Sequence, residues 1–399
     1  MDMAMAARLG PLGLPHAALL GSSAAASTRA LPLAPSRAPR LPYPLPHFPT
    51  CRRPSSSSSA AAYAARPRPR RGSPRLLAVR AMASGNPYAA ELAAAKKAVT
   101  LAARLCQAVQ QDIVHSGIQS KADKSPVTVA DYGSQILVSL VLKMEVSSGP
   151  FSLVAEEEGI LSAIDDGKSK GGPTGRHWVL DPIDGTKGFV RGDQYAIALA
   201  LLDEGKVVLG VLACPNLPLS SISNPNGSSS GGQVGALFSA TIGCGAEVES
   251  LDGSPPQKIS VCSIDNPVNA SFFESYESAH SMHDLTGSIA EKLGVLAPPV
   301  RIDSQAKYGA LARGDGAIYL RFPHKGYKEK IWDHAAGSIV VTEAGGIVTD
   351  AAGNDLDFSK GRFLDLDTGI IATNKQLMPS LLKAVQDAIK EKNQAASLL

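Results

Sequence analysis

The pattern of hydrophobic and polar residues predicts that the folded part of the chain begins with two helices. From residue 86 onward, apolar side chains recur at steps of three or four positions, which places them on one face of an amphipathic helix. The β-branched residues 127–129, which follow Pro126, predict a short extended piece. Asp131 is then expected to head a second helix. The apolar face of the first helix consists of Leu92, Ala95, Val99, Ala102, Cys106, Val109 and Ile113.

The next part of the chain predicts a largely antiparallel sheet. Residues 151–160, FSLVAEEEGI, form an apolar run that ends in glutamates, and residues 178–184, WVLDPID, form a run that ends in two aspartates. Two further strands within residues 195–215 are joined at DEGK, residues 203–206, which predicts a hairpin. We therefore expect this half of the protein to combine helices with a meander of strands.

Strands and helices alternate in the second half, which is typical of layered α/β domains. The predicted strands have the sequences QKISVCS, GAIYLRF, IVTDAAG and GIIATN. We expect an N-terminal α+β domain over residues 84–255 and a C-terminal α/β domain over residues 256–399. The predicted helices of the second half start near residues 280, 333 and 378, and one more follows the strand within residues 299–314.

The first 83 residues have the composition of a targeting segment. Residues 1–80 contain twelve arginines, no lysine and one acidic residue, and they are rich in alanine, serine and proline. Transit peptides have this composition, whereas a secretory signal needs a longer apolar core. We expect a disordered transit peptide at residues 1–83 that directs the protein to the chloroplast, with the mitochondrion as the alternative. A low-complexity arm that stays attached is the other interpretation.

The charge of the remaining chain excludes some classes of partner. The whole chain has a formal charge of +3, but residues 81–399 contain 27 basic and 35 acidic residues. Such an acidic body lacks the basic face that a nucleic-acid polymer requires, and no apolar run is long enough to predict a membrane span. The cysteines after the leader lack metal-binding spacing, and a redox pair among them stays open: Cys106, Cys214, Cys244 and Cys262.

Six acidic residues lie at the ends of predicted elements, where functional groups concentrate. Carboxylates without a nearby cysteine or histidine pattern suit hard divalent cations, above all Mg²⁺. In DPID, proline stiffens the turn, so that both aspartates and the Ile183 carbonyl can face one point. Thr186 and Lys187 then open a short helix whose amides favour an anion. The six acids are Asp131, Glu156, Glu157, Asp181, Asp184 and Asp333.

Two longer motifs carry a resemblance to a known family. Residues 178–191, WVLDPIDGTKGFVR, and residues 332–346, WDHAAGSIVVTEAGG, resemble both signatures of the lithium-sensitive, magnesium-dependent phosphomonoesterases. This superfamily includes inositol monophosphatase and fructose-1,6-bisphosphatase. Residues 123–135, DKSPVTVADYGSQ, residues 303–308, DSQAKY, and residues 329–337, EKIWDHAAG, are similar to its 3′(2′),5′-bisphosphate nucleotidase branch. The resemblance implies a layered αβαβα sandwich.

The resemblance also implies a role for each matching residue. Asp131 and Thr186 would activate the attacking water. Two or three Mg²⁺ ions would be held by Glu156, Asp181, Asp184, Asp333 and the Ile183 carbonyl. The nucleotide would be contacted by His280, Ser304, Lys307, Arg321 and Asp333. Two choices stay open, because AEEE replaces the usual Gly-Glu-Glu and leaves Glu157 as a rival to Glu156, and because SAHSMHD also offers His283.

The function implied by this resemblance is removal of the 3′-phosphate of adenosine 3′,5′-bisphosphate (PAP), giving AMP and phosphate. Its sulfated relative, PAPS, is a further candidate substrate. The alternatives are an inositol phosphate phosphatase and a non-catalytic nucleotide sensor that has kept the fold. A small nucleotide is the expected partner, without a nucleic-acid polymer or a membrane, and a monomer is expected with a dimer as the alternative.

Overall fold

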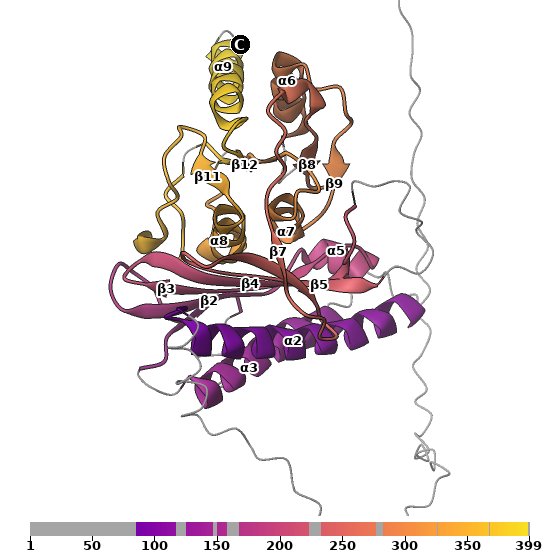
Figure 1. Cartoon of the computed structure of the whole chain (residues 1–399), viewed down its shortest axis with the longest axis vertical. Coiled ribbons are helices and arrows are strands. Elements are labelled where there is room, and N and C mark those ends of the chain that lie inside the picture. Colours follow the sequence, from indigo (N-terminus) through magenta and orange to yellow (C-terminus); the bar gives the residue numbers. More distant parts are fainter. Residues whose placement is uncertain are drawn as a thin grey trace, which may run out of the picture. The chain divides into compact units, whose positions relative to one another are not determined.

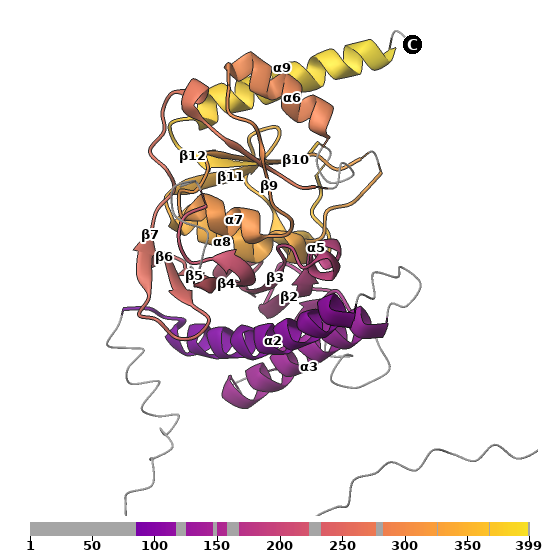
Figure 2. The same ribbon diagram turned by 90° about the vertical axis from the view of Figure 1, so that its right-hand side faces the viewer.

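The computed structural model describes residues 85–116, 125–146, 150–157, 167–222, 233–276, 282–324, 326–366 and 368–397. All of these residues belong to one compact unit, Pro69–Leu399. Within it the chain forms five layers in the order helices, sheet, helices, sheet, helices (Figures 1 and 2). This arrangement confirms the predicted αβαβα sandwich.

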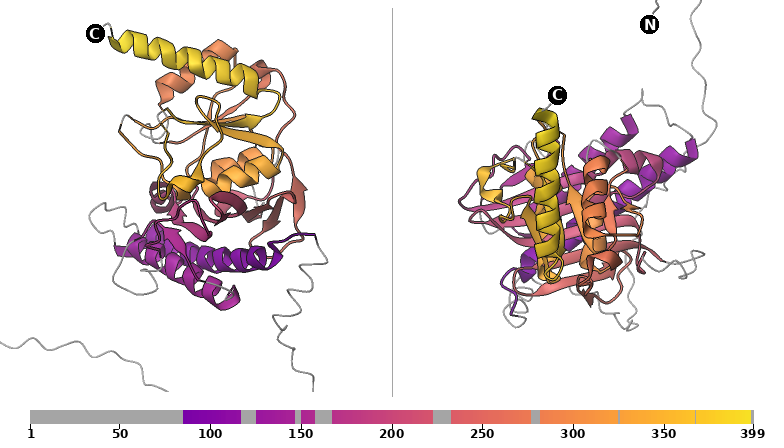
Figure 3. Two further views of the ribbon diagram at one scale, coloured as in Figure 1. Left: turned by 90° about the vertical axis from the view of Figure 1, so that its left-hand side faces the viewer. Right: turned by 90° about the horizontal axis from the view of Figure 1, so that it is seen from above.

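Each helical layer is formed by a pair of helices. α2 and α3 cover the outer face of the first sheet, α7 and α8 lie between the sheets, and α6 and α9 run side by side over the second sheet (Figure 3). In chain order, the described helices are α2 (Ala89–Ser116), α3 (Ser125–Glu145), α5 (Thr186–Arg191), α6 (His283–Leu293), α7 (Ala306–Ala312), α8 (Ala335–Glu343) and α9 (Met378–Ser397).

The first sheet is a meander in which neighbours in sequence are neighbours in space. Its strands follow the order β1 to β7; β1 is parallel to β2, and the other pairs are antiparallel. The hairpin between β3 and β4 turns at Glu204 and Gly205, both with positive φ, which matches the twist of the strands and confirms the predicted hairpin. The strands are β1 (Leu153–Ala155), β2 (Arg176–Asp184), β3 (Ala196–Asp203), β4 (Lys206–Pro218), β5 (Val234–Thr241), β6 (Gly245–Ser250) and β7 (Gln257–Ile259).

The second sheet is smaller and mixed, with the order β11-β12-β10-β8-β9. Its strands alternate with helices along the chain, as predicted, except that only a short 3₁₀ turn separates β11 from β12. They are β8 (Phe272–Glu274), β9 (Val300–Arg301), β10 (Ile318–Arg321), β11 (Gly346–Asp350) and β12 (Ile370–Asn374). Short 3₁₀ turns η1 (Pro267–Asn269), η2 (Ile331–Asp333) and η3 (Phe358–Lys360) lie in the connections.

The helical stripe of α2 is confirmed, and its small residues bring the helix close to the sheet. Ala95, Val99, Ala102 and Cys106 are fully buried. They pack against apolar residues of the first sheet, and the resulting cluster also contains Leu180. Removal of this apolar surface from water is the main stabilising contribution of the first helical layer.

The extended piece predicted at residues 127–129 is wrong. These residues belong to α3, which begins at Ser125, so Asp131 lies inside the helix and does not head it. Pro126 is tolerated because it stands in the first turn, where its missing N–H has no intrahelical partner. The low helix propensity of the β-branched residues is a weak effect that does not end the helix here.

The second sheet begins beyond the predicted domain boundary at residues 255/256. β7 follows this boundary but still pairs with β6 in the first sheet. The division into two domains stays a prediction. Among the described residues, no helix combines the length and apolarity needed to cross a membrane.

Candidate active site

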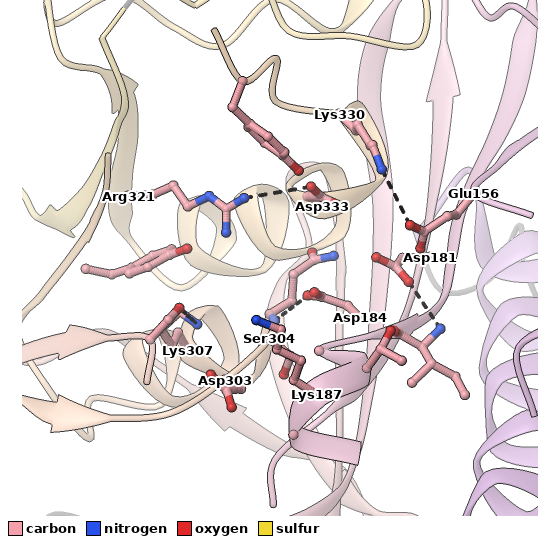
Figure 4. Close-up of a pocket in the computed structure, with 18 residues that line it drawn as sticks. Glu156, Asp181, Asp184, Lys187, Asp303, Ser304, Lys307, Arg321, Lys330 and Asp333 are labelled. Atoms are coloured by element: carbon pink, nitrogen blue, oxygen red, sulfur yellow. Dashed lines mark hydrogen bonds and ion pairs between the residues drawn. The ribbon is translucent and has the colours of Figure 1, made fainter. Parts of the chain in front are cut away.

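One pocket collects most of the residues that the sequence singles out (Figure 4). It lies where the ends of β1 and β2 meet α7, β10 and η2. The acidic side chains come mainly from the first sheet, and the buried basic side chains come from the second half of the chain. The predicted site residues in its lining are Glu156, Asp181, Ile183, Asp184, Thr186, Ser304, Lys307, Arg321 and Asp333.

The irregular end of β2 directs its two aspartates into this pocket. The register of β2 and β3 shifts between Asp181 and Asp184, so both side chains reach the same side although they are three residues apart. The Ile183 N–H donates to Asp181 Oδ1 at 3.1 Å, and Ser134 Oγ of α3 donates to the Pro182 carbonyl at 3.0 Å. The turn is therefore fixed from within and from the neighbouring helix.

Gly185 links this turn to α5 through a conformation that other residues adopt with difficulty. Its φ is 89°, and a Cβ at this position would lie 2.9 Å from Ser304 Cβ. Thr186 then begins α5, as predicted. Gln110 of α2 donates to the carbonyl of the buried Phe189 at 2.8 Å, which holds α5 against the first helical layer.

Gly185→Ala is expected to destabilise the protein. The left-handed conformation costs about 1–2 kcal/mol for a residue with a Cβ, and the contact with Ser304 adds to this cost. Urea denaturation should show a lower free energy of unfolding. Gly287→Ala in α6 is the matched control, because a Cβ there meets nothing within 4 Å and alanine favours a helix. Equal stability of the two variants would contradict the prediction.

Gln305 connects three parts of the pocket wall. Its backbone N–H donates to Asp184 Oδ2 at 2.5 Å, and its side-chain Nε2 donates to the Trp332 carbonyl at 2.8 Å. Its Oε1 accepts from the Gly337 N–H at 3.0 Å. One buried residue therefore sets the start of α7 relative to the DPID turn and to the residue before Asp333.

The geometry separates the two glutamates that the sequence left as rivals. Glu156 lines the pocket, and its Oε1 lies 3.5 Å from Lys330 Nζ. Glu157 is held outside the lining by backbone hydrogen bonds with Gln135. A hydrogen bond with Tyr132 also acts on the Glu157 carboxyl. The position of Glu156 thus agrees with a role at the pocket, while its binding of metal stays a prediction.

Burial and mutual repulsion disfavour the charged form of the carboxylates on the acidic side of the pocket when no cation is bound. Burial, followed by the charges of Glu156 and Asp184, raises the pKa of Asp181 well above its usual value. Burial and then Asp184 likewise raise the pKa of Asp333. Asp131 lies outside the lining, but burial and the charges of Glu157 and Glu156 raise its pKa to about 8. Oxygen ligands in this arrangement fit divalent metal ions, which relieve the repulsion.

The basic side of the pocket consists of buried cations with defined partners. Lys307 is 2% exposed, and its Nζ donates to Ser275 Oγ at 3.0 Å and to the Ile302 carbonyl at 2.8 Å. Burial lowers the pKa of Lys307 to about 8. Arg321 donates to Glu329 through Nε and Nη2, at 2.7 and 2.9 Å. These cations are therefore held in place before any anion binds.

The predicted nucleotide contact His280 lies outside the described residues. His283 begins α6, and its Nε2 donates to the Ser275 carbonyl at 3.1 Å. It does not belong to the pocket lining. The choice between His280 and His283 therefore stays a prediction.

Several lining residues were not predicted. Gln305 and Lys330 stand inside the quoted motifs DSQAKY and EKIWDHAAG, so the motifs contained the signal but assigned them no role. The ring of Tyr319 faces Lys307, with its centroid 5.4 Å from Nζ. The ring centroid of Tyr327 lies 5.9 Å from the guanidinium carbon of Arg321. No role was predicted for either tyrosine from the sequence.

Comparison with known proteins agrees with this fold and pocket. The model of the inositol monophosphatase family matches residues 87–390. The chain belongs to this family of layered αβαβα proteins.

Two curated relatives match with high identity. A 3′(2′),5′-bisphosphate nucleotidase of Oryza sativa is 80% identical over 355 residues, which cover 79% of this chain and 99% of the relative. The 3′(2′),5′-bisphosphate nucleotidase 1 of Arabidopsis thaliana is 64% identical and covers 78% of this chain and 99% of its own length. Among solved structures, an inositol monophosphatase from Zymomonas mobilis has a TM-score of 0.53 at 20% identity and covers 75% of this chain and 99% of its own. This last likeness concerns the fold alone.

Proposed function

We propose that this protein is a Mg²⁺-dependent phosphomonoesterase that removes the 3′-phosphate of PAP and gives AMP and phosphate. The observation that carries the proposal is the pocket itself, which sets a group of carboxylates opposite two buried cations. In a nucleoside bisphosphate, the reacting phosphate would lie at the carboxylates with their metal ions, and the second phosphate would lie at the buried cations. The names of the rice and Arabidopsis relatives support the same substrate class.

The proposed metal ligands are the lining groups Glu156, Asp181, Asp184, Asp333 and the Ile183 carbonyl. Two or three Mg²⁺ ions held there would supply neutralisation of the phosphate dianion and activation of water. The raised pKa values of Asp181 and Asp333 support this assignment, since they indicate repulsion that a cation relieves. Inhibition by Li⁺ is part of the proposal, as the family resemblance implies.

We assign activation of the attacking water to Thr186 and Asp131. Thr186 stands at the start of α5, and its Oγ1 donates to the Ile183 carbonyl at 3.4 Å. The pKa of Asp131 near 8 makes its carboxylate a stronger base than an ordinary aspartate. The threonine hydroxyl would orient the water and pass a proton towards Asp131.

We assign the second phosphate of PAP to Lys307 and Arg321, and we expect Lys307→Met to weaken PAP binding. A charge-assisted hydrogen bond contributes about 1.5–3 kcal/mol, so KM for PAP should rise roughly tenfold to a hundredfold. Loss of binding that is equal in the ground and transition states leaves kcat nearly intact. Steady-state kinetics with 3′-AMP provide the control, because this substrate has no second phosphate. Equal losses on PAP and 3′-AMP would rule out this role.

The decisive experiment measures phosphate release by the purified protein with and without Mg²⁺. PAP, PAPS and inositol 1,4-bisphosphate are compared at equal concentration. Preference for PAP, abolished by a chelator, is the expected result. Preference for the inositol bisphosphate would favour the alternative inositol phosphatase, and PAP binding without turnover would indicate a nucleotide sensor.

We propose that residues 1–83 are a chloroplast transit peptide and are dispensable for catalysis. The match to the rice relative covers 99% of that protein but only 79% of this chain, which leaves a portion about as long as the leader without a counterpart. The 84–399 fragment should keep kcat/KM within about twofold, since deletion of residues 1–83 takes away none of the pocket residues described above. An aggregated or inactive fragment would contradict this. A fluorescent protein fused to residues 1–83 tests the destination, with mitochondrial import as the alternative outcome.

We further propose that the active form is a monomer. Sedimentation of the active protein tests this, and a stable dimer is the alternative.

A further inference from the structure

We propose that Glu329 is a positioning residue that holds the Arg321 guanidinium away from Asp333 and so keeps Asp333 available to a divalent cation. Glu329 lies just before η2 and is outside the pocket lining. The inference rests on the proposed function, because it takes Asp333 as a metal ligand.

The contact between Arg321 and Glu329 has the geometry of a fixed fork. Nε donates to one carboxylate oxygen at 2.7 Å and Nη2 to the other at 2.9 Å. Both side chains are buried, with 10% and 1% of their surface exposed. A bidentate pair fixes the plane of the guanidinium as well as its position. Arg321 therefore cannot rotate without breaking two hydrogen bonds.

Glu329 is itself anchored from its other side. His334 Nε2 donates to Glu329 Oε2 at 3.0 Å, and His334 Nδ1 lies 2.9 Å from the Tyr308 hydroxyl. Both partners are buried in the helical layer between the sheets. The carboxylate that holds Arg321 is thus part of a rigid network and not a mobile surface group.

Asp333 is the carboxylate that competes for Arg321. Its Oδ2 lies 3.9 Å from Arg321 Nη2, which is the other ion pair of Arg321 in the described part of the chain. A small rotation of the guanidinium would bring the two groups into direct contact. Such a pair would neutralise the charge that a cation at Asp333 needs. The structure thus places Arg321 between two carboxylates and gives the closer contact to the one that lines no part of the pocket.

A metal site at Glu329 itself does not explain this arrangement. Ligand atoms of Glu329, Asp333 and His334 lie within 4.8 Å of one another, which resembles a metal-binding group. However, Arg321 donates to both oxygens of Glu329, and His334 uses its Nε2 in the contact with Glu329. These atoms already have hydrogen-bond partners. Positioning of Arg321 accounts for all the contacts.

The test is a double-mutant cycle on Mg²⁺ affinity, measured by titration calorimetry on the full chain without substrate. The four proteins are the wild type, Glu329→Asp, Arg321→Met and the double variant. Aspartate keeps the negative charge, but its side chain is shorter by one methylene. A change in Mg²⁺ affinity therefore cannot be attributed to loss of a negative charge near the site. We expect Glu329→Asp to weaken Mg²⁺ binding about tenfold, or ~1.4 kcal/mol. In the Arg321→Met background, the same change should have less than about a twofold effect, since no guanidinium remains to move.

If the wild type binds Mg²⁺, two results would overturn the inference. One is wild-type Mg²⁺ affinity in folded Glu329→Asp, and the other is an equal loss in both backgrounds, which would indicate general loosening of the pocket. Glu343→Asp, whose carboxylate accepts hydrogen bonds from Gly243 and Gly245 at the end of α8, is the control for shortening a glutamate. Circular dichroism and thermal melting verify folding of every variant. Absence of Mg²⁺ binding in the wild type would refute the proposed metal site and this inference with it, whereas binding without coupling would refute the inference alone.

Discussion

Replacing Asp184 by asparagine is expected to reduce phosphate release from PAP by a factor on the order of 10²–10³, because one removed electrostatic contact in an active site typically costs this much. Asparagine has nearly the same shape, and its side-chain oxygen can still accept the hydrogen bond from the Gln305 N–H. The variant therefore loses the charge of a proposed metal ligand without losing the link to α7. Turnover at saturating PAP and the Mg²⁺ dissociation constant are the quantities to measure.

The control for Asp184→Asn is Asp387→Asn. Asp387 is exposed on α9 and pairs with Lys383, far along the chain from the pocket residues. Its neutralisation changes the net charge by the same amount and should leave turnover unaltered. If Asp184→Asn retains a tenth or more of wild-type turnover while folded, the assignment of DPID to metal binding is wrong.

Thr186→Val is expected to lower kcat by roughly 10²–10⁴, the range that a positioned proton-transfer group contributes. Valine keeps the branched shape of threonine and removes only the hydroxyl. Because the proposed metal ligands are unchanged, Mg²⁺ affinity should stay within about twofold of wild type. The measurement pairs single-turnover kinetics with calorimetry.

Thr186→Ser is the matched control for the hydroxyl. It should recover most of the activity that Thr186→Val loses, since serine offers the same donor at the start of α5. Equal activity of the valine and serine variants would show that the hydroxyl does not take part in the reaction. A large loss of Mg²⁺ affinity in Thr186→Val would instead place this residue at the metal centre.

The sequence predicted the parts of the site that depend on local geometry. The DPIDG turn is one such part, because proline restricts the backbone and glycine permits the bend where the strand ends, so that Asp181 and Asp184 reach the same pocket. The hairpin at Glu204 and Gly205 and the short helix after Gly185 are others. In each case the conformation is decided within a few residues.

Other features depend on contacts between distant segments and could not be predicted in this way. Asp131 was placed at the head of a helix, because the preceding β-branched residues favour an extended chain, yet α3, which packs on α2, begins at Ser125 and runs through them. Tyr319 and Tyr327 line the pocket only because β10 and the segment before η2 fold over it. Arg321 and Glu329 are only eight residues apart, but no local pattern in the sequence indicated that they pair.

The link that Gln305 makes between Asp184, the Trp332 carbonyl and Gly337 has a consequence for the internal motions of the protein. It spans the first sheet and the middle helical layer, and a ligand in the pocket would span the same layers. We expect the pocket to open by separation of these layers. A bound nucleotide, which would contact both layers, should make this separation less frequent. Amide hydrogens of α7 and α8 should then exchange with solvent more slowly when the pocket is filled, while those of α9 on the outer face keep their rate.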